Sequence, residues 1–215
     1  MNEYYATRLT HDPARAAVWK HVGAYLQRWV DADGPVLDLA AGYSDFLRSI
    51  DAARKVAVDT NPSLPDFTGD GVEAIVGDAT DLSGFGDGEF ATVFASNFIE
   101  HLDHDAIDAL LLEIGRVLSP GGRLILVQPN FRLDPHRYFD DYTHRTVFTD
   151  RSLADYLAVQ GFAIERVEAR FLPLTLRSRL SWGHRLVPMY LRSPYRPLAG
   201  QMLVVARKEV DRVAP

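Results

Sequence analysis

Residues 36–44 read Val36-Leu-Asp-Leu-Ala-Ala-Gly-Tyr-Ser44, an apolar run that contains an acid and leads into a glycine turn. A short apolar run bounded by such a turn is typical of a buried strand. Two similar units follow, Val56-Ala-Val-Asp59 and Ala74-Ile-Val-Gly-Asp78. Strands that alternate with helices build a parallel sheet, and ligands bind beyond the carboxyl ends of its strands. The pattern therefore predicts an α/β fold with a ligand site at one edge of the sheet.

The spacing of the acids at these predicted strand ends indicates the kind of ligand. Asp59 lies 21 positions after Asp38, close to the distance at which an acid binds ribose hydroxyls in nucleotide-binding units. Asp78 follows 19 positions later. The first turn, Ala40-Ala-Gly-Tyr-Ser-Asp45, lacks the Gly-x-Gly-x-x-Gly pattern of dinucleotide oxidoreductases, so that class is a poor match. An adenosine-type ligand is the better interpretation.

In this order the motifs resemble the class I S-adenosylmethionine-dependent methyltransferases. The first loop of that family reads roughly acid-x-Gly-x-Gly-x-Gly. Here Asp38 and Gly42 match, while Ala40 and Ser44 stand at the outer glycine positions. Small residues still let the backbone approach a ligand closely. A tight turn without a ligand is the simpler alternative for Gly42.

The resemblance covers residues 36–130 most strongly. Residues 94–102 match the family's fourth strand and the loop after it, and residues 112–127 match a helix, a Pro-Gly-Gly turn and the fifth strand. It implies a Rossmann-like methyltransferase fold, with a seven-stranded, mostly parallel sheet, helices on both faces and an antiparallel final strand. Hydrophobic periodicity predicts strands at 36–40, 55–59, 73–77, 90–96, 123–128, 162–168 and 201–207, and helices at 13–30, 44–50, 104–117 and 150–160.

The chain is predicted to form a single methyltransferase domain over residues 1–215. Residues 1–33 would be an N-terminal helical cover, and residues 36–130 the cofactor-binding core. The long connections at 131–149 and 170–200 would be loops or a lid on the acceptor side, because long loops in compact domains usually carry function.

The resemblance implies that S-adenosyl-L-methionine is the cofactor and S-adenosyl-L-homocysteine the product. Asp59 matches the acid that binds the ribose, and Asp78 with Ala79 matches the pair at the adenine edge. Asp38 would orient the first loop and waters near the cofactor's amino group. A solvated carboxylate at a strand end is the alternative for Asp59. The expected cofactor-binding residues are Tyr5, Arg8, Asp38, Ala40, Ala41, Gly42, Asp59, Thr60, Asn61, Asp78, Ala79, Ser96, Asn97, Phe98 and His101.

Acids and histidines near residue 140 are the catalytic candidates. A hydroxyl acceptor loses its proton as the methyl group arrives, and His or Asp can accept that proton near neutral pH. His144 is the best candidate for this base, with Asp140 or Asp141 orienting its ring. His101 could line the cofactor pocket, act as a base or pack. The cluster around His144 could instead anchor its loop.

A metal ion is not expected from the sequence. Asp140 and Asp141 are adjacent and can point apart, and His101 with His104 lacks a third ligand at a fixed spacing. The chain also has no cysteine, which excludes disulfides and thiolate metal sites.

Composition separates an acidic body from a basic segment. The net charge is −6, yet residues 169–208 hold eight Arg or Lys and no acid, which leaves 15 basic and 29 acidic residues elsewhere. Nucleic-acid binding is disfavoured by that body. The segment Arg170 to Arg196 could contact a membrane surface or an anionic substrate, or form an ordinary subdomain or dimer contact. No signal peptide or spanning segment is visible, which favours a cytoplasmic protein that is at most peripheral to a membrane.

Three segments resemble those of a bacterial subgroup of this family that is often associated with polysaccharide or glycan biosynthesis, and this resemblance suggests the class of acceptor. They are Pro129-Asn130, Tyr138 to His144 and Phe171 to Leu180. This implies an O-methyltransferase that acts on a hydroxyl of a small molecule or glycan precursor. An N-methyltransferase of a small amine and a non-catalytic cofactor-binding module are the alternatives.

Overall fold

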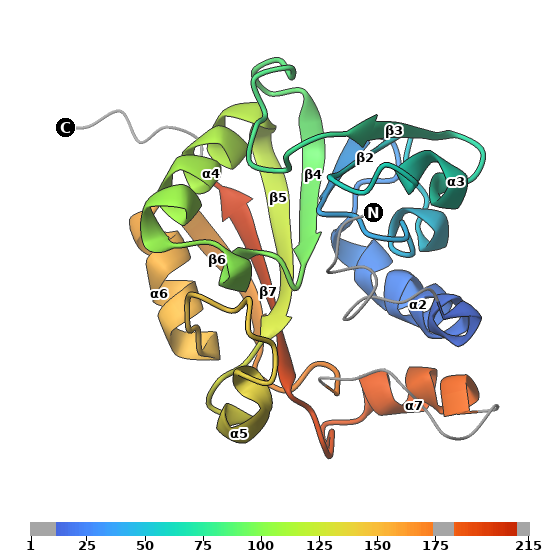
Figure 1. Ribbon diagram of the computed structural model, residues 1–215, viewed down its shortest axis with the longest axis vertical. Coiled ribbons are helices and arrows are strands. Elements are labelled where there is room, and N and C mark those ends of the chain that lie inside the picture. The colour runs from blue at the N-terminus through green and yellow to red at the C-terminus, as the bar shows by residue number, and fades with distance from the viewer. Residues whose placement is uncertain (1–11, 174–182, 210–215) are drawn as a thin grey trace.

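The computed structural model describes residues 12–173 and 183–209, which contain one seven-stranded sheet (Figure 1). The strand order is β3-β2-β1-β4-β5-β7-β6. The first five strands pair in parallel, and β7 is antiparallel to both of its neighbours. This confirms the predicted methyltransferase fold. The strands are β1 (Pro35–Leu39), β2 (Arg54–Asp59), β3 (Val72–Val76), β4 (Phe90–Ser96), β5 (Leu118–Pro129), β6 (Phe162–Glu168) and β7 (Gln201–Lys208).

Helices cover both faces of the sheet (Figure 1). On one face, α4 and α6 bury side chains such as Leu110 and Leu153 against the strands. On the other face, Val22 of α2 and Leu191 of α7 belong to a second core cluster. The helices are α2 (Pro13–Leu26), α3 (Leu64–Thr68), α4 (His104–Val117), α5 (Pro135–Tyr138), α6 (Asp150–Val159) and α7 (Val187–Arg192), with 3-10 turns η1 (Gln27–Trp29), η2 (Leu47–Ser49), η3 (Ile99–His101) and η4 (Gly183–Leu186).

Helix ends follow local capping chemistry. The Oδ1 atom of Asp12 accepts from the backbone N–H of Ala14 at 2.9 Å, and proline occupies the first position of α2. Thr149 and Ser152 form a reciprocal capping box at the start of α6. Both starts were predicted. Since each cap satisfies backbone groups that the first turn leaves unpaired, the two helices begin where these side chains stand.

The helix predicted at 44–50 is wrong. The structure has only the 3-10 turn η2 there, because the preceding loop takes up left-handed backbone conformations through Ser44. The predicted helix 13–30 ends as α2 at Leu26 and continues as η1. Three short helices that were not predicted, α3, α5 and α7, each have proline in the first turn.

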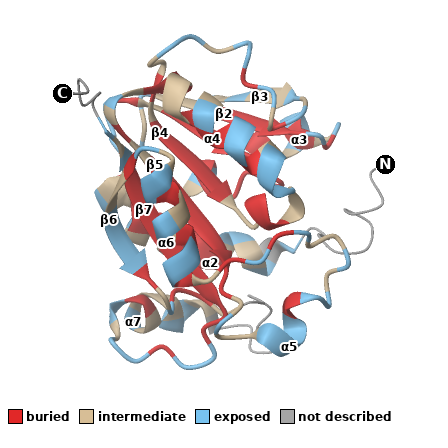
Figure 2. Cartoon of the chain, turned by 90° about the vertical axis from the view of Figure 1, so that its left-hand side faces the viewer, coloured by how far each residue is buried: buried red, intermediate tan, exposed pale blue. Residues whose placement is uncertain are grey.

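Burial is concentrated in the middle of the sheet. Strands β1, β4, β5 and β7 are almost wholly buried, whereas residues 165–167 of the edge strand β6 are exposed (Figure 2). Phe94 of β4 stacks on Phe46 with ring centroids 3.7 Å apart and meets the edge of Trp19. Such packing fixes the direction of β4, and with it the loop that follows Ser96. Among the described residues, no helix is both long and apolar enough to cross a membrane.

Candidate active site

The loop after β1 holds three residues with left-handed backbone. Ala40, Gly42 and Ser44 have φ angles of 53°, 58° and 56°. These are the three positions where the family motif places glycine. The loop thus keeps the backbone path of that motif although two side chains oppose it, since a non-glycine residue in this region costs roughly 1–2 kcal/mol. Gly42 lies within a turn that the N–H of Ser44 closes by donating to the carbonyl of Ala41 at 2.8 Å.

Asp59 fixes this loop from the end of β2. One carboxylate oxygen accepts from the N–H of Gly42 at 2.8 Å, and the other from the N–H of Asn61 at 2.8 Å. The side chain is only 4% exposed, so it is not a solvated strand-end carboxylate. A carboxylate oxygen can accept from more than one donor, so the same side chain can also accept from the hydroxyls of a ribose.

Asp38 lies deeper, on β1. Burial raises its pKa well above the ordinary value, and the nearby carboxylates of Asp59 and Asp45 raise it further, while Arg15 opposes them. The Nε of Arg15 is 2.9 Å from a carboxylate oxygen of Asp45. Arg48 pairs with the other oxygen of Asp45 at 2.7 Å. The sequence analysis did not assign a role to Asp45, whose only signal was its place directly after the loop.

The exposed Asp78 and the buried Ala79 follow the end of β3. Asp78 follows β3, and its Oδ1 accepts from the N–H and the hydroxyl of Thr80 at 2.9 and 2.8 Å. Ala79 is buried, and Thr60, which follows β2, is exposed. This arrangement is compatible with an adenine edge that lies beside Asp78.

The end of β4 is tied to its neighbours through Asn97. This residue also has a left-handed backbone, with φ of 49°, and its N–H donates to the carbonyl of Val127 at 2.9 Å. Its Oδ1 accepts from Gln201 of β7 at 2.8 Å, and its Nδ2 donates to Ser96 at 3.2 Å. Asn97 and the half-buried Phe98 thus stand at a fixed position on the sheet edge.

Close to this turn, a buried carboxylate and two half-buried imidazoles form a cluster. The Nε2 atoms of His101 and His144 each lie 3.9 Å from Oε1 of Glu100. Glu100 is 1% exposed, and within the described part of the chain neither of its oxygens has a hydrogen-bond partner. Burial raises the pKa of Glu100 to about 8. His101 and His144 were predicted as site residues from the sequence, whereas Glu100 was not.

Thr143 and Asp141 set the orientation of His101. The Thr143 hydroxyl lies 2.6 Å from Oδ1 of Asp141 and 2.8 Å from Nδ1 of His101. Because this hydroxyl has one proton to give to the carboxylate, it accepts from Nδ1–H of His101. The second imidazole nitrogen, Nε2, is the one that faces Glu100, at 3.9 Å from its Oε1.

Asp141 therefore bonds Thr143 and supports His101, whereas the sequence analysis had it orient the His144 ring. Burial would raise the pKa of Asp141, but the two hydrogen bonds from Thr143 and the nearby histidines hold it below its ordinary value. Burial lowers the pKa of His101, and the neighbouring His144 lowers it further. Asp140, the other predicted partner, is exposed.

Several polar residues of the predicted acceptor side hold the loop together. The Nδ2 of Asn130 donates to Asp150 at 2.9 Å and to the carbonyl of Ala169 at 3.0 Å. The Tyr138 hydroxyl donates to the carbonyl of Thr146 at 2.6 Å and is buried. These hydrogen bonds hold the loop that follows β5 in place. Tyr5, Arg8 and the segment 174–182 of the predicted lid lie outside the described residues.

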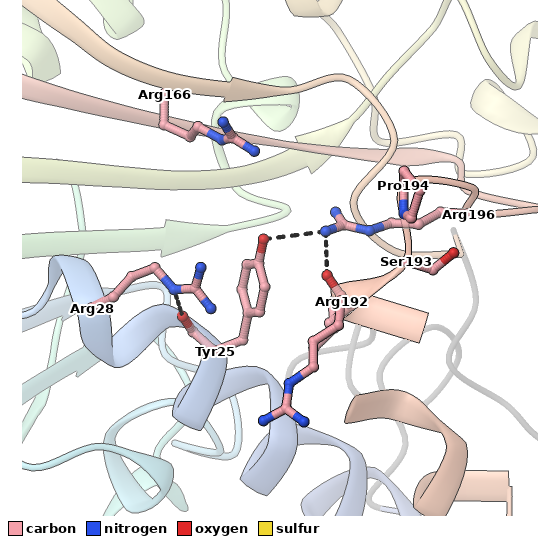
Figure 3. Close-up of a pocket in the computed structure, with 8 residues that line it drawn as sticks. Tyr25, Arg28, Arg166, Arg192, Ser193, Pro194 and Arg196 are labelled. Atoms are coloured by element: carbon pink, nitrogen blue, oxygen red, sulfur yellow. Dashed lines mark hydrogen bonds between the residues drawn. The ribbon is translucent and has the colours of Figure 1, made fainter. Parts of the chain in front are cut away.

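An open, basic hollow lies beside the edge strand β6 (Figure 3). Exposed Arg28, Arg166 and Arg192 contribute to its wall. Arg196, at its inner end, is buried and pairs with Glu168 and the Tyr25 hydroxyl. Two strands, β5 and β7, separate β6 from β4 in the sheet, so the hollow is distinct from the Glu100 cluster.

Comparison with known proteins agrees with this geometry. Residues 37–126 match the family model described as methyltransferase domain. None of the curated proteins matches the chain.

Three solved structures share the fold over nearly all of the chain. An S-adenosylmethionine-dependent methyltransferase from Archaeoglobus fulgidus is 20% identical, with a TM-score of 0.65 over 96% of this chain and 98% of that one. A protein from Pyrococcus horikoshii is 21% identical, with a TM-score of 0.67 over 97% and 100%. The third is the 1,6-didemethyltoxoflavin-N1-methyltransferase of Burkholderia thailandensis, with its substrate and S-adenosylhomocysteine bound. It is 21% identical, with a TM-score of 0.61 over 91% and 80%. Residues 37–126 are therefore similar to a methyltransferase domain, and the chain shares the fold of these solved structures.

Proposed function

We propose that the enzyme methylates a hydroxyl oxygen of a small molecule or glycan precursor. The observation that carries this proposal is the cluster of the buried Glu100 with the half-buried His101 and His144, close to the Asn97 turn at the sheet edge. A hydroxyl must lose its proton as it is methylated, whereas a neutral amine needs no strong base before it attacks. A protein that only bound the cofactor would have no need for two half-buried imidazoles beside a buried carboxylate at this place.

The residues would divide into two groups along the sheet edge. Asp59, with the loop it holds, would bind the ribose of the cofactor, and Asp78 with Ala79 would meet the adenine edge. The cofactor supplies a methyl group on a sulfonium sulfur. The hydroxyl oxygen of the acceptor forms the new bond to the methyl carbon as the carbon–sulfur bond breaks. In the protein without an ion, His101 would take the hydroxyl proton at Nε2, because Thr143 holds its other nitrogen protonated.

Positioning supplies much of the rate in such a displacement, because the cofactor already carries the reactive group. The packing of Phe94 and the hydrogen bonds of Asn97 support this role, since they hold the acceptor side in place relative to the cofactor loop.

The test is a methyl-transfer assay with a panel of hydroxylated and amine acceptors, sugars first. We expect turnover of a hydroxyl acceptor, with kcat reduced by about 10²- to 10⁴-fold in His101→Ala. His136→Ala is the matched control, because His136 is exposed on α5 and outside the cluster. Turnover of amines that survives both His101→Ala and His144→Ala would replace this proposal with N-methylation. Tight cofactor binding without turnover of any acceptor would favour a binding module.

The basic hollow is proposed to contact an anionic part of the acceptor or an anionic membrane surface. Support comes from the three exposed arginines on its wall, which can bind phosphate or carboxylate groups. Sedimentation with vesicles of anionic and neutral lipids separates the two sources. Binding to anionic vesicles that Arg166→Ala with Arg192→Ala removes would support a membrane contact, and no binding would leave a soluble anionic acceptor.

A further inference from the structure

The unsatisfied carboxylate of Glu100 is the starting point for a second inference about the acceptor side. Burying a carboxylate without hydrogen bonds is costly, and buried carboxylates are normally paired or bound to a metal. Among the described residues, both oxygens of Glu100 lack a hydrogen-bond partner at 1% exposure. The surrounding packing thus keeps a carboxylate, which is a common metal ligand, out of contact with solvent.

The two histidines bring further ligand atoms to the same point. One ligand atom from each of Glu100, His101 and His144 lies within 4.8 Å of the other two. The two imidazole rings are 5.0 Å apart, centroid to centroid, and are inclined at 64°, so they approach from different directions. A zinc ion at about 2.1 Å from each ligand holds tetrahedral ligands about 3.4 Å apart. The observed separation of 3.9 Å between each Nε2 and Oε1 therefore needs only a small contraction.

The surroundings of His101 are those of a metal ligand. Metal-binding histidines usually donate their other ring N–H to a carboxylate or another acceptor, which fixes the ring and raises its basicity. Here Nδ1–H of His101 meets the Thr143 hydroxyl, which in turn donates to Asp141. The chain therefore has both a ligand set and an outer hydrogen-bond relay.

We propose that Glu100, His101 and His144 bind a divalent transition-metal ion, with zinc as the first choice, at a site that leaves coordination positions open. Two imidazoles and one carboxylate suit Zn²⁺, Fe²⁺ and similar ions, and disfavour Ca²⁺ and Mg²⁺, which prefer oxygen ligands. No metal was expected from the sequence, because only the pairs Asp140–Asp141 and His101–His104 were examined there.

The role of the ion rests on the proposed function. An acceptor hydroxyl that occupies an open position would have its pKa lowered by the ion, as metal-bound water does. Its proton would pass to water, and the oxygen would attack the methyl carbon while the carbon–sulfur electron pair returns to sulfur. With the ion bound, the histidines act as ligands and no longer as bases.

The test uses tag-free, full-length protein treated with a chelator, dialysed, and titrated with Co²⁺ by visible absorption and with Zn²⁺ by calorimetry. We expect one ion per chain and visible bands of a Co²⁺ ion with nitrogen ligands. Glu100→Gln and His144→Ala should each weaken binding by at least about tenfold. His136→Ala should bind like the unaltered chain.

Titration of the same samples with S-adenosylhomocysteine shows whether each variant is folded and separates this inference from the proposed function. Absence of Co²⁺ bands in a chain that binds S-adenosylhomocysteine would overturn the metal site and leave the methyltransferase intact. Equal Zn²⁺ affinity in folded Glu100→Gln and the unaltered chain would also overturn it.

Discussion

The two sides of the sheet edge treat their buried carboxylates in opposite ways. On the cofactor side, both oxygens of Asp59 accept backbone N–H groups of the protein itself. On the acceptor side, neither oxygen of Glu100 accepts a hydrogen bond from the described residues. Asp59 therefore fixes the loop after β1 without any ligand, whereas both oxygens of Glu100 stay without a hydrogen bond among the described residues. The hydrogen bonds of Asp59 are thus structural, whereas the oxygens of Glu100 remain available to a ligand.

The largest effect on stability should come from Asp59→Ala. The substitution leaves two buried N–H groups, of Gly42 and Asn61, without their acceptor, and we expect the free energy of unfolding to fall by about 2–5 kcal/mol. Chemical denaturation measures it. Asp59→Asn is the matched control and should lose less, because one acceptor oxygen remains. A loss below the error of the measurement would mean that Asp59 does not build the loop.

Glu100→Gln should affect activity and hardly affect folding. No hydrogen bond within the described residues is lost, so the free energy of unfolding of the metal-free protein should stay within about 1 kcal/mol of the original value. Methyl transfer should fall at least about tenfold, because the amide of glutamine cannot replace the carboxylate as a metal ligand. A variant as active as the unaltered enzyme would show that Glu100 has no part in the reaction.

Asp38 offers a comparison through pH. Its folded-state pKa is raised by burial and by Asp59 and Asp45, with Arg15 opposing, so its neutral form is the one that folding favours. The stability of the unaltered chain relative to Asp38→Asn should therefore be highest below pH 3.8, the ordinary value, and should fall as pH rises through the raised pKa. Paired denaturation curves from acidic to alkaline pH measure this difference. A difference that is constant with pH, or that grows as pH rises, would contradict the prediction.

The smallest effect concerns the left-handed positions of the first loop. Ala40→Gly should raise the free energy of unfolding by about 0.5–1 kcal/mol, because glycine adopts a positive φ without strain. Ser44→Gly should do the same and also removes a buried hydroxyl that lacks a partner among the described residues. Ala41→Gly is the control, since Ala41 has no positive φ, and it should destabilise the chain by a similar amount. Equal changes at residues 40 and 41 would refute the strain argument.

Much of the fold followed from local patterns in the sequence. The strand-end acids, the capping residues Asp12 and Thr149 and the apolar runs are local signals, and the structure places them as predicted. The helix expected at 44–50 failed because the loop geometry overrides helical periodicity there.

The Glu100 cluster could not be predicted in the same way. Glu100 and His144 are 44 positions apart, and only the packing of the loop at 135–148 brings them together. Its buried state is a property of tertiary structure, because a lone glutamate after a strand is usually exposed. Asp141 was likewise assigned to the wrong imidazole, since sequence proximity favoured His144 over His101.

We infer that the loop held by Asp59 binds S-adenosylmethionine, and calorimetric titration measures this binding. The purified chain is titrated with S-adenosylmethionine and S-adenosylhomocysteine, beside Asp59→Ala and the control His144→Ala. We predict one binding site that His144→Ala retains and Asp59→Ala loses. Absence of binding by the intact chain, or equal binding by folded Asp59→Ala, would contradict the account.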